Sequence, residues 1–471
     1  MRKKSGFKMP HTLVLIYVLV IAVYILSLLV PSGEFKRVEK SFQGQTKLIT
    51  VPGTYTNIEK KYLGPQWLLI APIRGFEDGA LIIFLIFIFG GAFSILGRTG
   101  AIESGIQKLA QFFSRNQRLK KIVIPVLMVV FSLAGGVYGM AEESIPFVLI
   151  FIPLALSLGY DSIVGVSIPF LASAVGFSAA FFNPFTVGIA QGFSDLPLYS
   201  GLMYRLILWV IGTIIAIVFV VIYAEKIRKT PEKSPVYEID KNRDYSTAKD
   251  KSKDLPWGFA QKIVIWVLFG GIALLVYGIL VKSWYMEEIA ALFLGIGLIS
   301  GFIARIPPSE IATSFIAGAK DVMNVTLIIA GGRAILIILN EAVVLDTILQ
   351  FTAGLISAVP GIITAHMMFF TQAIINFFIH SGTAQAALTM PIMAPLSDLV
   401  GITRQTTVLA FQMCEVINPI LPTSAVTMGV LGVAKIPWEK WARWFLPLMM
   451  ILIVFSLISL VPPILMNWGP F

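Results

Sequence analysis

The stretch GGVYGMAEES, residues 135–144, interrupts an apolar region and determines the predicted fold. It lies between two apolar arms, residues 122–135 and 145–159, and it carries two adjacent carboxylates. The first arm is too short to cross a membrane comfortably, because a spanning helix needs about 20 apolar residues. Irregular backbone at membrane depth is tolerated only where protein or a water-filled cavity satisfies its polar groups. The pattern therefore predicts a re-entrant hairpin, residues 122–160, with Glu142 and Glu143 at its tip.

The composition indicates that this hairpin belongs to a multi-spanning membrane protein. Of the 471 residues, 57% are hydrophobic and 13% are charged, whereas soluble domains carry about 25% charged residues. Many charge-free stretches predict spanning helices and exclude a transmembrane barrel, whose strands are short and alternating. The first apolar run, residues 11–30, is too long for the core of a signal peptide. The net charge of +10 resides in short loops, which indicates orientation in a membrane and argues against nucleic acid as a partner.

The sequence contains no pattern typical of a cofactor site, a metal site or an enzyme. Cys414 is the single cysteine, and the three histidines have no metal-ligand spacing. No phosphate-binding P-loop motif occurs, so ATP hydrolysis by this chain is not expected. We therefore expect a protein that is not an enzyme and that has no cofactor, with Na⁺ or H⁺ as candidate coupling ions.

Basic residues orient the predicted spans. Four of them, Arg2, Lys3, Lys4 and Lys8, precede the first span at residues 12–30, which predicts a cytoplasmic N-terminus in the bacterial inner membrane. The chain would then cross outward through this first span.

The next part of the first half contains one more span before the hairpin. Residues 31–64 form a polar loop whose six Lys and Arg residues run against the positive-inside rule. An interfacial segment at residues 66–76 precedes a second span at about residues 78–97. Residues 98–121 are strongly basic and should be cytoplasmic, and the amphipathic stretch Ile102–Phe113 should lie on the membrane surface.

A proline predicts a broken helix after the first hairpin. Residues 162–190 are apolar but contain FNPFT at residues 182–186, and proline removes a backbone donor and disrupts the preceding turn. A span at residues 201–223 then returns to a charged cytoplasmic loop, residues 224–257. This loop divides the chain almost in half.

The second half repeats features of the first. Five short patterns recur in the same order at offsets between 235 and 243 residues. The matched pairs are Gly90-Gly91 with Gly331-Gly332, Ile102–Ile106 with Val344–Ile348, Tyr138–Glu142 with Ser381–Gln385, Asn183-Pro184 with Asn418-Pro419, and Leu196-Pro197 with Ile436-Pro437. The repeat predicts a second hairpin at residues 359–400 and a second broken helix at residues 403–432.

Loop charges indicate that the two halves face opposite ways. Six basic residues flank the predicted surface helix of the first half, whereas its counterpart at about residues 343–357 carries only Asp346. The parity requires one connecting helix, residues 258–281, between a first repeat (residues 1–223) and a second repeat (residues 282–471). The predicted fold is an all-α polytopic protein with nine crossings, two re-entrant hairpins and two broken helices. Inverted repeats with broken helices at the midplane are a hallmark of secondary transporters.

The sequence resembles the C4-dicarboxylate anaerobic carrier family, and within it the YfcC-type branch, whose members are named as basic amino-acid antiporters. The resemblance covers nearly the whole chain. It rests on GMAEE at residues 139–143, FNPFT at residues 182–186, SGTAQ at residues 381–385 and the NP and PTS elements within residues 418–424. The family belongs to a broader ion-transporter superfamily. The resemblance implies a homodimeric elevator, with a scaffold and a mobile transport domain built from hairpins and broken helices.

The candidate substrate site consists of the two hairpin tips and the two breaks. A charge at membrane depth costs about 2.5–3.5 kcal/mol or more, so Glu142 and Glu143 should face a cavity or a partner; a shallow hairpin would leave them in water. Small residues in the second tip let a ligand approach backbone donors, or they serve a close helix contact. The breaks expose carbonyl oxygens, or they are ordinary proline kinks. The candidates are Gly139, Glu142, Glu143, Asn183, Pro184, Thr186, Ser381, Gly382, Thr383, Gln385, Asn418, Pro422, Thr423 and Ser424, with Arg333, His380 and Glu415 as further ionisable residues.

These residues favour an amino acid over a dicarboxylate as the substrate. The first tip offers two carboxylates and no adjacent base, so it suits an ammonium group, and the Gly382–Thr383 tip suits a carboxylate. The leading hypothesis is a secondary transporter of a small amino acid, and a basic amino acid is one candidate. A C4-dicarboxylate carrier of the same fold and an ion or solute channel stay as alternatives.

Overall fold

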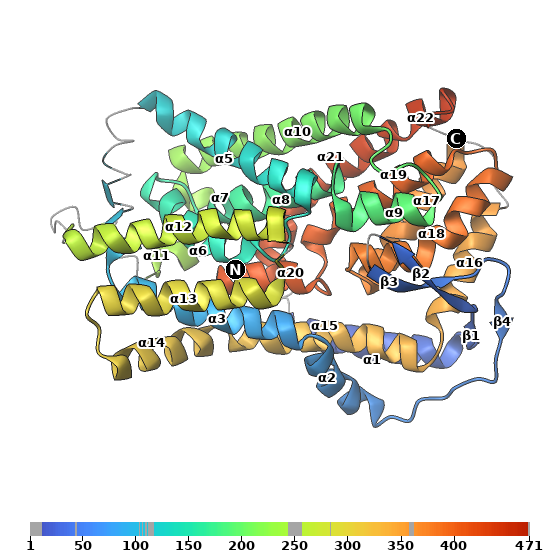
Figure 1. The fold of residues 1–471 in the computed structure, drawn as a ribbon, viewed down its shortest axis with the longest axis horizontal. Helices are drawn as coiled ribbons and strands as arrows, with labels where there is room; N and C mark the ends of the chain where they lie inside the picture. The colour runs from blue at the N-terminus through green and yellow to red at the C-terminus, as the bar shows by residue number, and fades with distance from the viewer. Residues whose placement is uncertain are drawn as a thin grey trace, which may run out of the picture.

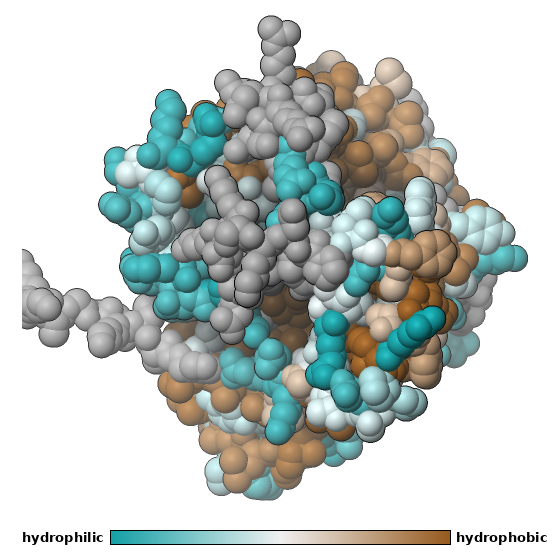
Figure 2. Space-filling model, turned by 90° about the vertical axis from the view of Figure 1, so that its left-hand side faces the viewer, coloured by the Kyte–Doolittle hydropathy of each residue, from teal (hydrophilic) through white to brown (hydrophobic). Residues whose placement is uncertain are grey.

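The computed structural model describes residues 12–42, 45–102, 104–105, 107–108, 111, 117–243, 257–282, 284–357 and 362–469. As expected, the fold is helical, and most helices run along one direction (Figure 1). The predicted surface stretch Ile102–Phe113 lies partly outside the described residues. Figure 2 faces the left-hand end of Figure 1 and shows hydrophilic residues gathered over this end, with hydrophobic residues on the flanks beside them.

Eight helical segments of the described chain are long and apolar enough to cross a membrane. They are Thr12–Leu29, Ala80–Arg98, Leu202–Lys229, Phe259–Ile279, Met286–Ile303, Met323–Glu341, Arg404–Val433 and Trp438–Leu465. The chain is therefore a multi-pass membrane protein. The ninth expected crossing, residues 162–190, contains the shorter apolar helix Ser162–Ser178, which ends before the predicted break.

The first half builds one hairpin followed by one interrupted helix. The hairpin arms are α5 (Gln117–Tyr138) and α6 (Ser144–Ser157). The first arm ends later than expected, because the helix continues through Gly135 and Gly136 to Tyr138. Its apolar part, Ile122–Tyr138, is shorter than each of the eight candidate spans, as expected. The interrupted helix comprises α7 (Ser162–Val166), a π-helical turn (Ser167–Leu171), α8 (Ala172–Ser178), a second π-helical turn (Pro184–Gly188) and α9 (Ile189–Phe193), before the long helix α10 (Leu202–Lys229).

The second half has the same order of elements. Its hairpin arms are α17 (Ile362–Phe378) and α18 (Gly382–Leu399). The interrupted helix comprises α19 (Arg404–Met413), a 3-10 turn (Cys414–Ile420) and α20 (Ala425–Val433). The long helix α21 (Trp438–Ser459) and the short helix α22 (Val461–Leu465) follow.

Two sets of three helices pack against each other in a reciprocal way. One set is α1 (Thr12–Leu29), α2 (Trp67–Asp78) and α3 (Ala80–Arg98), and the other is α13 (Met286–Ile303), α14 (Pro308–Asp321) and α15 (Met323–Glu341). Helices α1 and α2 pack on α15, while α13 and α14 pack on α3. The connecting helix α12 (Phe259–Lys282) packs on α13.

Close packing between these sets depends on small residues. A methyl group at Gly75 of α2 would lie 2.1 Å from the Ala330 carbonyl oxygen of α15. A methyl group at Gly318 of α14 would lie 2.1 Å from the Gly90 carbonyl oxygen of α3. Glycine at both positions allows the backbones to touch, which is how membrane helices associate without a hydrophobic driving force.

The polar loop at residues 31–64 is the exception to the all-α expectation. It contains two antiparallel pairs, β1 (Gly33–Glu34) with β4 (Thr56–Asn57) and β2 (Arg37–Phe42) with β3 (Gln45–Thr50). The loop is fixed to the start of α16 (Leu345–Ser357), where Arg37 pairs with Asp346 at 2.7 Å.

Acids of the second half also account for further basic residues around this loop. Lys61 lies 3.3 Å from the Glu341 carboxylate, and Arg74 lies 2.5 Å from it. Two of the six basic residues of the loop, Arg37 and Lys61, therefore pair with acids of the second half.

The linker between the halves begins later than expected. Residues 224–229 continue α10, and the segment after Thr230 forms a 3-10 turn (Pro231–Lys233) and α11 (Tyr237–Lys241). The backbone N–H of Ser162 donates to Asp240 at 2.8 Å, and Ser234 donates to Asp161 at 2.7 Å. The first part of the linker is thus packed onto the base of the first hairpin.

Candidate functional site

The first tip lies directly on the first break. Gly139 has a φ of +77°, in the left-handed region that favours glycine, so α5 can end there and the chain can turn toward α6. A methyl group at Gly139 would lie 2.7 Å from the amide of Asn183. Only glycine therefore fits between the tip and Asn183.

The two glutamates of this tip have different surroundings. Glu143 is 7% exposed, and its carboxylate accepts a hydrogen bond from the Ala141 backbone N–H at 2.9 Å. Glu142 is partly exposed. The positive charge of Arg333 on α15 lies within electrostatic reach of Glu142. Glu142 is thus the better placed of the two to meet a ligand from outside the hairpin.

Arg333 also belongs to an ion pair across the reciprocal helix sets. Its guanidinium lies 3.3 Å from the Asp78 carboxylate at the end of α2. Both side chains are partly exposed. In this structure Arg333 therefore pairs with an acid of α2.

The first break carries buried polar atoms without partners. Asn183 caps the turn Pro184–Gly188 by accepting from the Phe185 N–H at 2.9 Å. Among the described residues, the Asn183 amide nitrogen and the Thr186 hydroxyl have no hydrogen-bond partner, and both side chains are almost fully buried. Because buried polar groups are nearly always paired, a group that enters this site would find open hydrogen-bond positions.

The second tip contacts both breaks. The Thr383 hydroxyl donates to the Phe185 carbonyl oxygen of the first break at 2.9 Å. A methyl group at Gly382 would lie 2.5 Å from the Thr186 methyl and 3.7 Å from a carboxylate oxygen of Glu415. Ser381 caps α18 by accepting from the Ala384 N–H at 3.4 Å. The N-terminus of α18 therefore points into the region where the two breaks meet.

A buried amide network supports the second tip. The Gln385 amide donates to the Gln372 side chain at 2.8 Å and accepts from Asn376 at 2.9 Å. Asn376 also donates to Glu415 at 3.1 Å, and Gln372 donates to Thr389 at 3.0 Å. The network fixes α18 against α17 and against the second break.

The second break has its own set of side-chain bonds. Glu415 is 2% exposed, and its second oxygen accepts from the Asn418 amide at 3.1 Å. Thr423 donates to the Phe377 carbonyl oxygen at 2.9 Å, and its hydroxyl is 2.7 Å from His380 Nε2. Ser424 caps α20 by accepting from the Thr427 N–H at 3.3 Å. These bonds hold the break against the end of α17.

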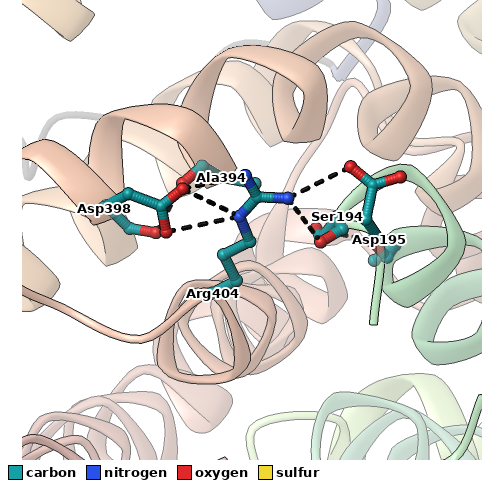
Figure 3. A network of polar contacts seen from close by, with 7 residues as sticks. Ser194, Asp195, Ala394, Asp398 and Arg404 are labelled. Atoms are coloured by element: carbon teal, nitrogen blue, oxygen red, sulfur yellow. Dashed lines mark hydrogen bonds and ion pairs between the residues drawn. The ribbon is translucent and has the colours of Figure 1, made fainter. Parts of the chain in front are cut away.

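In each half, an arginine from another segment bonds the carbonyl oxygen that follows the last helix of the interrupted helix. Arg404 at the start of α19 bonds the Asp398 carboxylate at 2.8 Å, Asp195 at 3.1 Å and the Ser194 carbonyl oxygen at 3.1 Å (Figure 3). At the other end, Arg243 of the linker bonds the Ala434 carbonyl oxygen at 2.5 Å. Arg404 thus caps the C-terminus of α9, and Arg243 caps the C-terminus of α20.

The linker contact includes a buried acid. Arg243 also bonds Asp240 at 2.8 Å. The neighbouring Asp161 caps α7 by accepting from the Val164 N–H at 3.0 Å. Burial raises the pKa of the Asp161 carboxyl, and its hydrogen bonds to Tyr223 and Ser234 oppose that shift.

Most of the predicted site residues come together in one region. The first tip meets the first break, and the second tip meets both breaks. Pro184 occupies the first position of its turn, where its missing N–H is tolerated. Pro422 lies between the 3-10 turn and α20. Arg333 is on a different set of helices, on the side of Glu142.

Two amide residues that support the second tip, Gln372 and Asn376, are not among the residues predicted from the sequence. Gln372 and Asn376 are four residues apart in an apolar arm, and Gln385 and Thr389 have the same spacing in the next arm. That spacing places each pair on one helix face. Polar pairs on facing arms of an apolar hairpin were the signal that could have identified them.

Comparisons with known proteins place this arrangement in a family. Residues 9–464 match the family model described as "C4-dicarboxylate anaerobic carrier". The chain is 35% identical over 467 residues to "Putative basic amino acid antiporter YfcC" of Escherichia coli (strain K12), which covers 92% of this chain and 91% of that protein. It is 26% identical over 478 residues to an uncharacterized protein of Haemophilus influenzae, covering 93% of each chain.

Two solved transporters show a distant overall similarity. The Alcanivorax borkumensis YdaH transporter has a TM-score of 0.43 and 14% identity, covering 98% of this chain and 100% of that chain. The Neisseria gonorrhoeae MtrF structure has a TM-score of 0.43 and 16% identity, covering 97% and 95%. At these TM-scores neither structure assigns features to this chain.

Proposed function

We propose that this chain, which belongs to the C4-dicarboxylate anaerobic carrier family, is a secondary active transporter, either an antiporter or ion-coupled, that moves a small amino acid across the bacterial inner membrane, with basic amino acids as the first candidates. The proposal includes an elevator mechanism, a homodimer, a cytoplasmic N-terminus, and coupling to a counter-substrate or to an ion such as Na⁺ or H⁺. No enzymatic activity is part of it.

The observation that carries the proposal is the meeting of two tips and two breaks around unpaired polar atoms. The unpaired atoms are the Asn183 amide nitrogen, the Thr186 hydroxyl and the Asn376 amide oxygen, taken over the described part of the chain. Leaving a buried polar group unsatisfied costs about 1–3 kcal/mol. A polar substrate that completes these bonds would relieve that cost, and water would do so in its absence.

The reciprocal helix packing supports two inverted repeats. Helices α1, α2 and α3 correspond in order to α13, α14 and α15, and each set packs on the last helix of the other. A pseudo-twofold axis produces such an exchange of contacts. These helices, with α12, would form the scaffold, while hairpins and broken helices would move as the transport domain.

The charges of the two tips support a zwitterionic or cationic substrate. The N-terminus of α18, with Gly382 and Thr383, favours a carboxylate because helix N-termini carry a partial positive charge. Glu142 and Glu143 at the first tip would face the ammonium group or the basic side chain. The name of the 35%-identical Escherichia coli protein agrees with this substrate class.

A C4-dicarboxylate is the second candidate, because the family description names that class. A dicarboxylate would need a second cationic group, and Arg333, whose charge acts on Glu142, is a candidate for it. In this structure Arg333 is paired with Asp78, which leaves less of its charge for a substrate.

A binding screen followed by exchange distinguishes the two candidates and the channel alternative. Purified protein is heated with arginine, lysine, a neutral amino acid or succinate, each with and without sodium, since a ligand that binds only the folded protein raises its melting temperature. We expect the basic amino acids to stabilise the protein most. Proteoliposomes preloaded with the hit should then show accelerated counterflow of the labelled compound, which a channel would not show. Stabilisation by succinate alone would overturn the amino-acid proposal.

A further inference from the structure

A large apolar cavity separates α12 from the first hairpin. Its volume is about 800 Å³, within the range of about 300–1,000 Å³ that small-molecule pockets occupy. Helix α12 packs on α13 on one side and faces α5 and α6 across the cavity on the other. The proposed substrate site does not use this cavity.

Three helices each contribute one apolar stripe to the cavity wall. Helix α12 contributes Ile265, Leu268, Ile272 and Val276, and helix α5 contributes Leu127, Phe131, Ala134 and Tyr138 with the same spacing of three or four residues. Helix α6 adds Phe147, Ile150 and Phe151. In these stripes, only the Tyr138 side chain can form a hydrogen bond with water. Cavities lined in this way stay dry, because water finds too few polar partners in them.

The cavity opens sideways and has one polar end. Val130 of α5 and Phe269 of α12 line it and are 56% and 57% exposed, so the gap between these helices is open to the membrane. Lys108 and Trp257 line the other part of the wall. A lysine and a tryptophan at one end of an apolar slot are typical of the level of lipid headgroups.

The length of the slot matches one leaflet of a bilayer. Its lining on α12 runs from Ile265 to Val276 and on α5 from Leu127 to Tyr138. Eleven residues at 1.5 Å each correspond to roughly 16 Å, which is about half of a hydrocarbon core roughly 30 Å thick. A single acyl chain with its headgroup at Lys108 would fill this length.

We propose that the cavity binds an anionic phospholipid, with one acyl chain between α12 and the first hairpin and with the phosphate at Lys108. The sideways opening admits the chain from the membrane. Basic side chains at membrane level attract anionic headgroups with about 1 kcal/mol each. The lipid would fill the space that the protein itself leaves between α12 and the α5–α6 hairpin.

The test measures phospholipid binding to the full-length protein with and without a filled cavity. Ala134→Phe and Ile272→Trp add bulk at two opposite walls, and Ile207→Trp adds bulk on an exposed face of α10 as a control. Delipidated protein is titrated with phosphatidylglycerol, and bound lipid is counted by native mass spectrometry alongside the melting temperature. We expect wild type and Ile207→Trp to bind and be stabilised, and the two filled variants to lose both responses.

The contribution of the Lys108 charge at the polar end of the cavity is tested separately. Lys108→Gln should weaken phosphatidylglycerol binding about fivefold, whereas Lys262→Gln, on an exposed position of α12 outside the cavity, should leave it unchanged. Phosphatidylethanolamine should bind more weakly than phosphatidylglycerol to wild type. Unchanged lipid binding in both filled variants would overturn the site, and equal binding of the two lipids would overturn the selection of an anionic headgroup. Both readouts are independent of transport, so they stand or fall separately from the proposed substrate.

Discussion

The two hairpin tips occupy matching places in the two halves and differ in charge and in backbone conformation. The first tip, residues 139–143, carries two carboxylates and turns through a glycine with positive φ. The second tip, residues 381–385, is uncharged and begins a long helix whose first residues contact both breaks. One tip therefore supplies negative charge, and the other supplies backbone donors and a tight fit. A substrate with one positive and one negative group would use both.

The two tips also differ in how firmly they are held. The second is fixed by the amide network of Gln372, Asn376 and Gln385. For the first, the Glu143 carboxylate bonds only the backbone of its own tip within the described contacts. We infer that the first tip moves more easily, because fewer side-chain bonds must break when it shifts.

The proposed opposite orientation of the two hairpins gives the largest expected effect. Glu232 is exposed on the linker segment that packs at the base of the first hairpin, and Leu399 is 84% exposed at the base of the second. In a background where the buried Cys414 is replaced by serine, cysteines at these two positions should label from opposite sides of the membrane. A membrane-impermeant thiol reagent applied to intact cells and to inverted vesicles measures this. Labelling of both from one side would contradict the inverted arrangement.

A change at either break, in the first half or in the second, should abolish substrate uptake. Asn183→Leu removes a buried cap and an open amide, and Thr423→Val removes the hydroxyl that bonds Phe377 and His380. Loss of the Asn183 cap costs only about 1 kcal/mol, and loss of a hydroxyl hydrogen bond at Thr423 costs about 0.5–1.5 kcal/mol, so the variants should still fold. Size-exclusion profiles and melting temperatures check folding, and proteoliposome uptake checks function.

Matched controls for the breaks are Asn340→Leu and Thr313→Val, at exposed positions of α15 and α14. Both controls should retain uptake. Full transport by Asn183→Leu and Thr423→Val would mean that the breaks are simple kinks and that the tips act without them.

The acidic tip should determine the response to substrate charge. A charge-assisted hydrogen bond contributes about 1.5–3 kcal/mol, so Glu142→Gln should weaken binding of a basic amino acid by about tenfold to a hundredfold. Glu143→Gln should have a smaller effect, because this carboxylate already accepts from Ala141. Isothermal titration with arginine, a neutral amino acid and succinate measures the difference.

Two outcomes at the acidic tip would change the proposal. If succinate binds to wild type and amino acids do not, the substrate is a dicarboxylate. If neither variant changes binding but uptake loses its dependence on pH or sodium, the glutamates serve coupling and not recognition.

The sequence predicted the parts of this site that break helical patterns, and it missed the parts that continue them. The GMAEE and SGTAQ tips and the two Asn-Pro breaks interrupt apolar runs, so they were visible without a structure. Gln372 and Asn376 lie inside an unbroken helix, and their partners Thr389 and Gln385 are on the facing arm α18, which only the packing of the two arms reveals. The length of α5 was underestimated because two glycines do not end a helix that is packed on both sides, as the close approach of Gly135 to Ser173 shows.

Long-range pairings were also beyond the sequence. Two of the six basic residues in the loop at residues 31–64, Arg37 and Lys61, pair with Asp346 and Glu341, about 300 residues away in the sequence. Arg243 and Arg404 cap two half-helices from separate segments, and no local pattern identifies such a partner. The four short strands depend on the same kind of contact, since the loop that carries them is fastened to α16.

The fit of the second tip gives the smallest expected effect and the sharpest comparison with the first. Gly382→Ala places a methyl group 2.5 Å from the Thr186 methyl. Overpacking of this kind costs about 1–3 kcal/mol, so substrate affinity should fall about tenfold as the tip moves away from Phe185. Thr186→Ser removes the opposing methyl and keeps the hydroxyl, so the double variant should recover most of the affinity.

Gly139→Ala at the first tip meets Asn183 and also forces alanine to a φ of +77°, which costs about 1–2 kcal/mol in itself. Shortening a neighbour cannot remove that backbone strain, so Gly139→Ala should stay defective when Asn183→Ser is added. Isothermal titration of the four variants tests this asymmetry. Equal rescue at both tips would show that the positive φ of Gly139 is unimportant, and no rescue at the second tip would show that Gly382 does more than make room for Thr186.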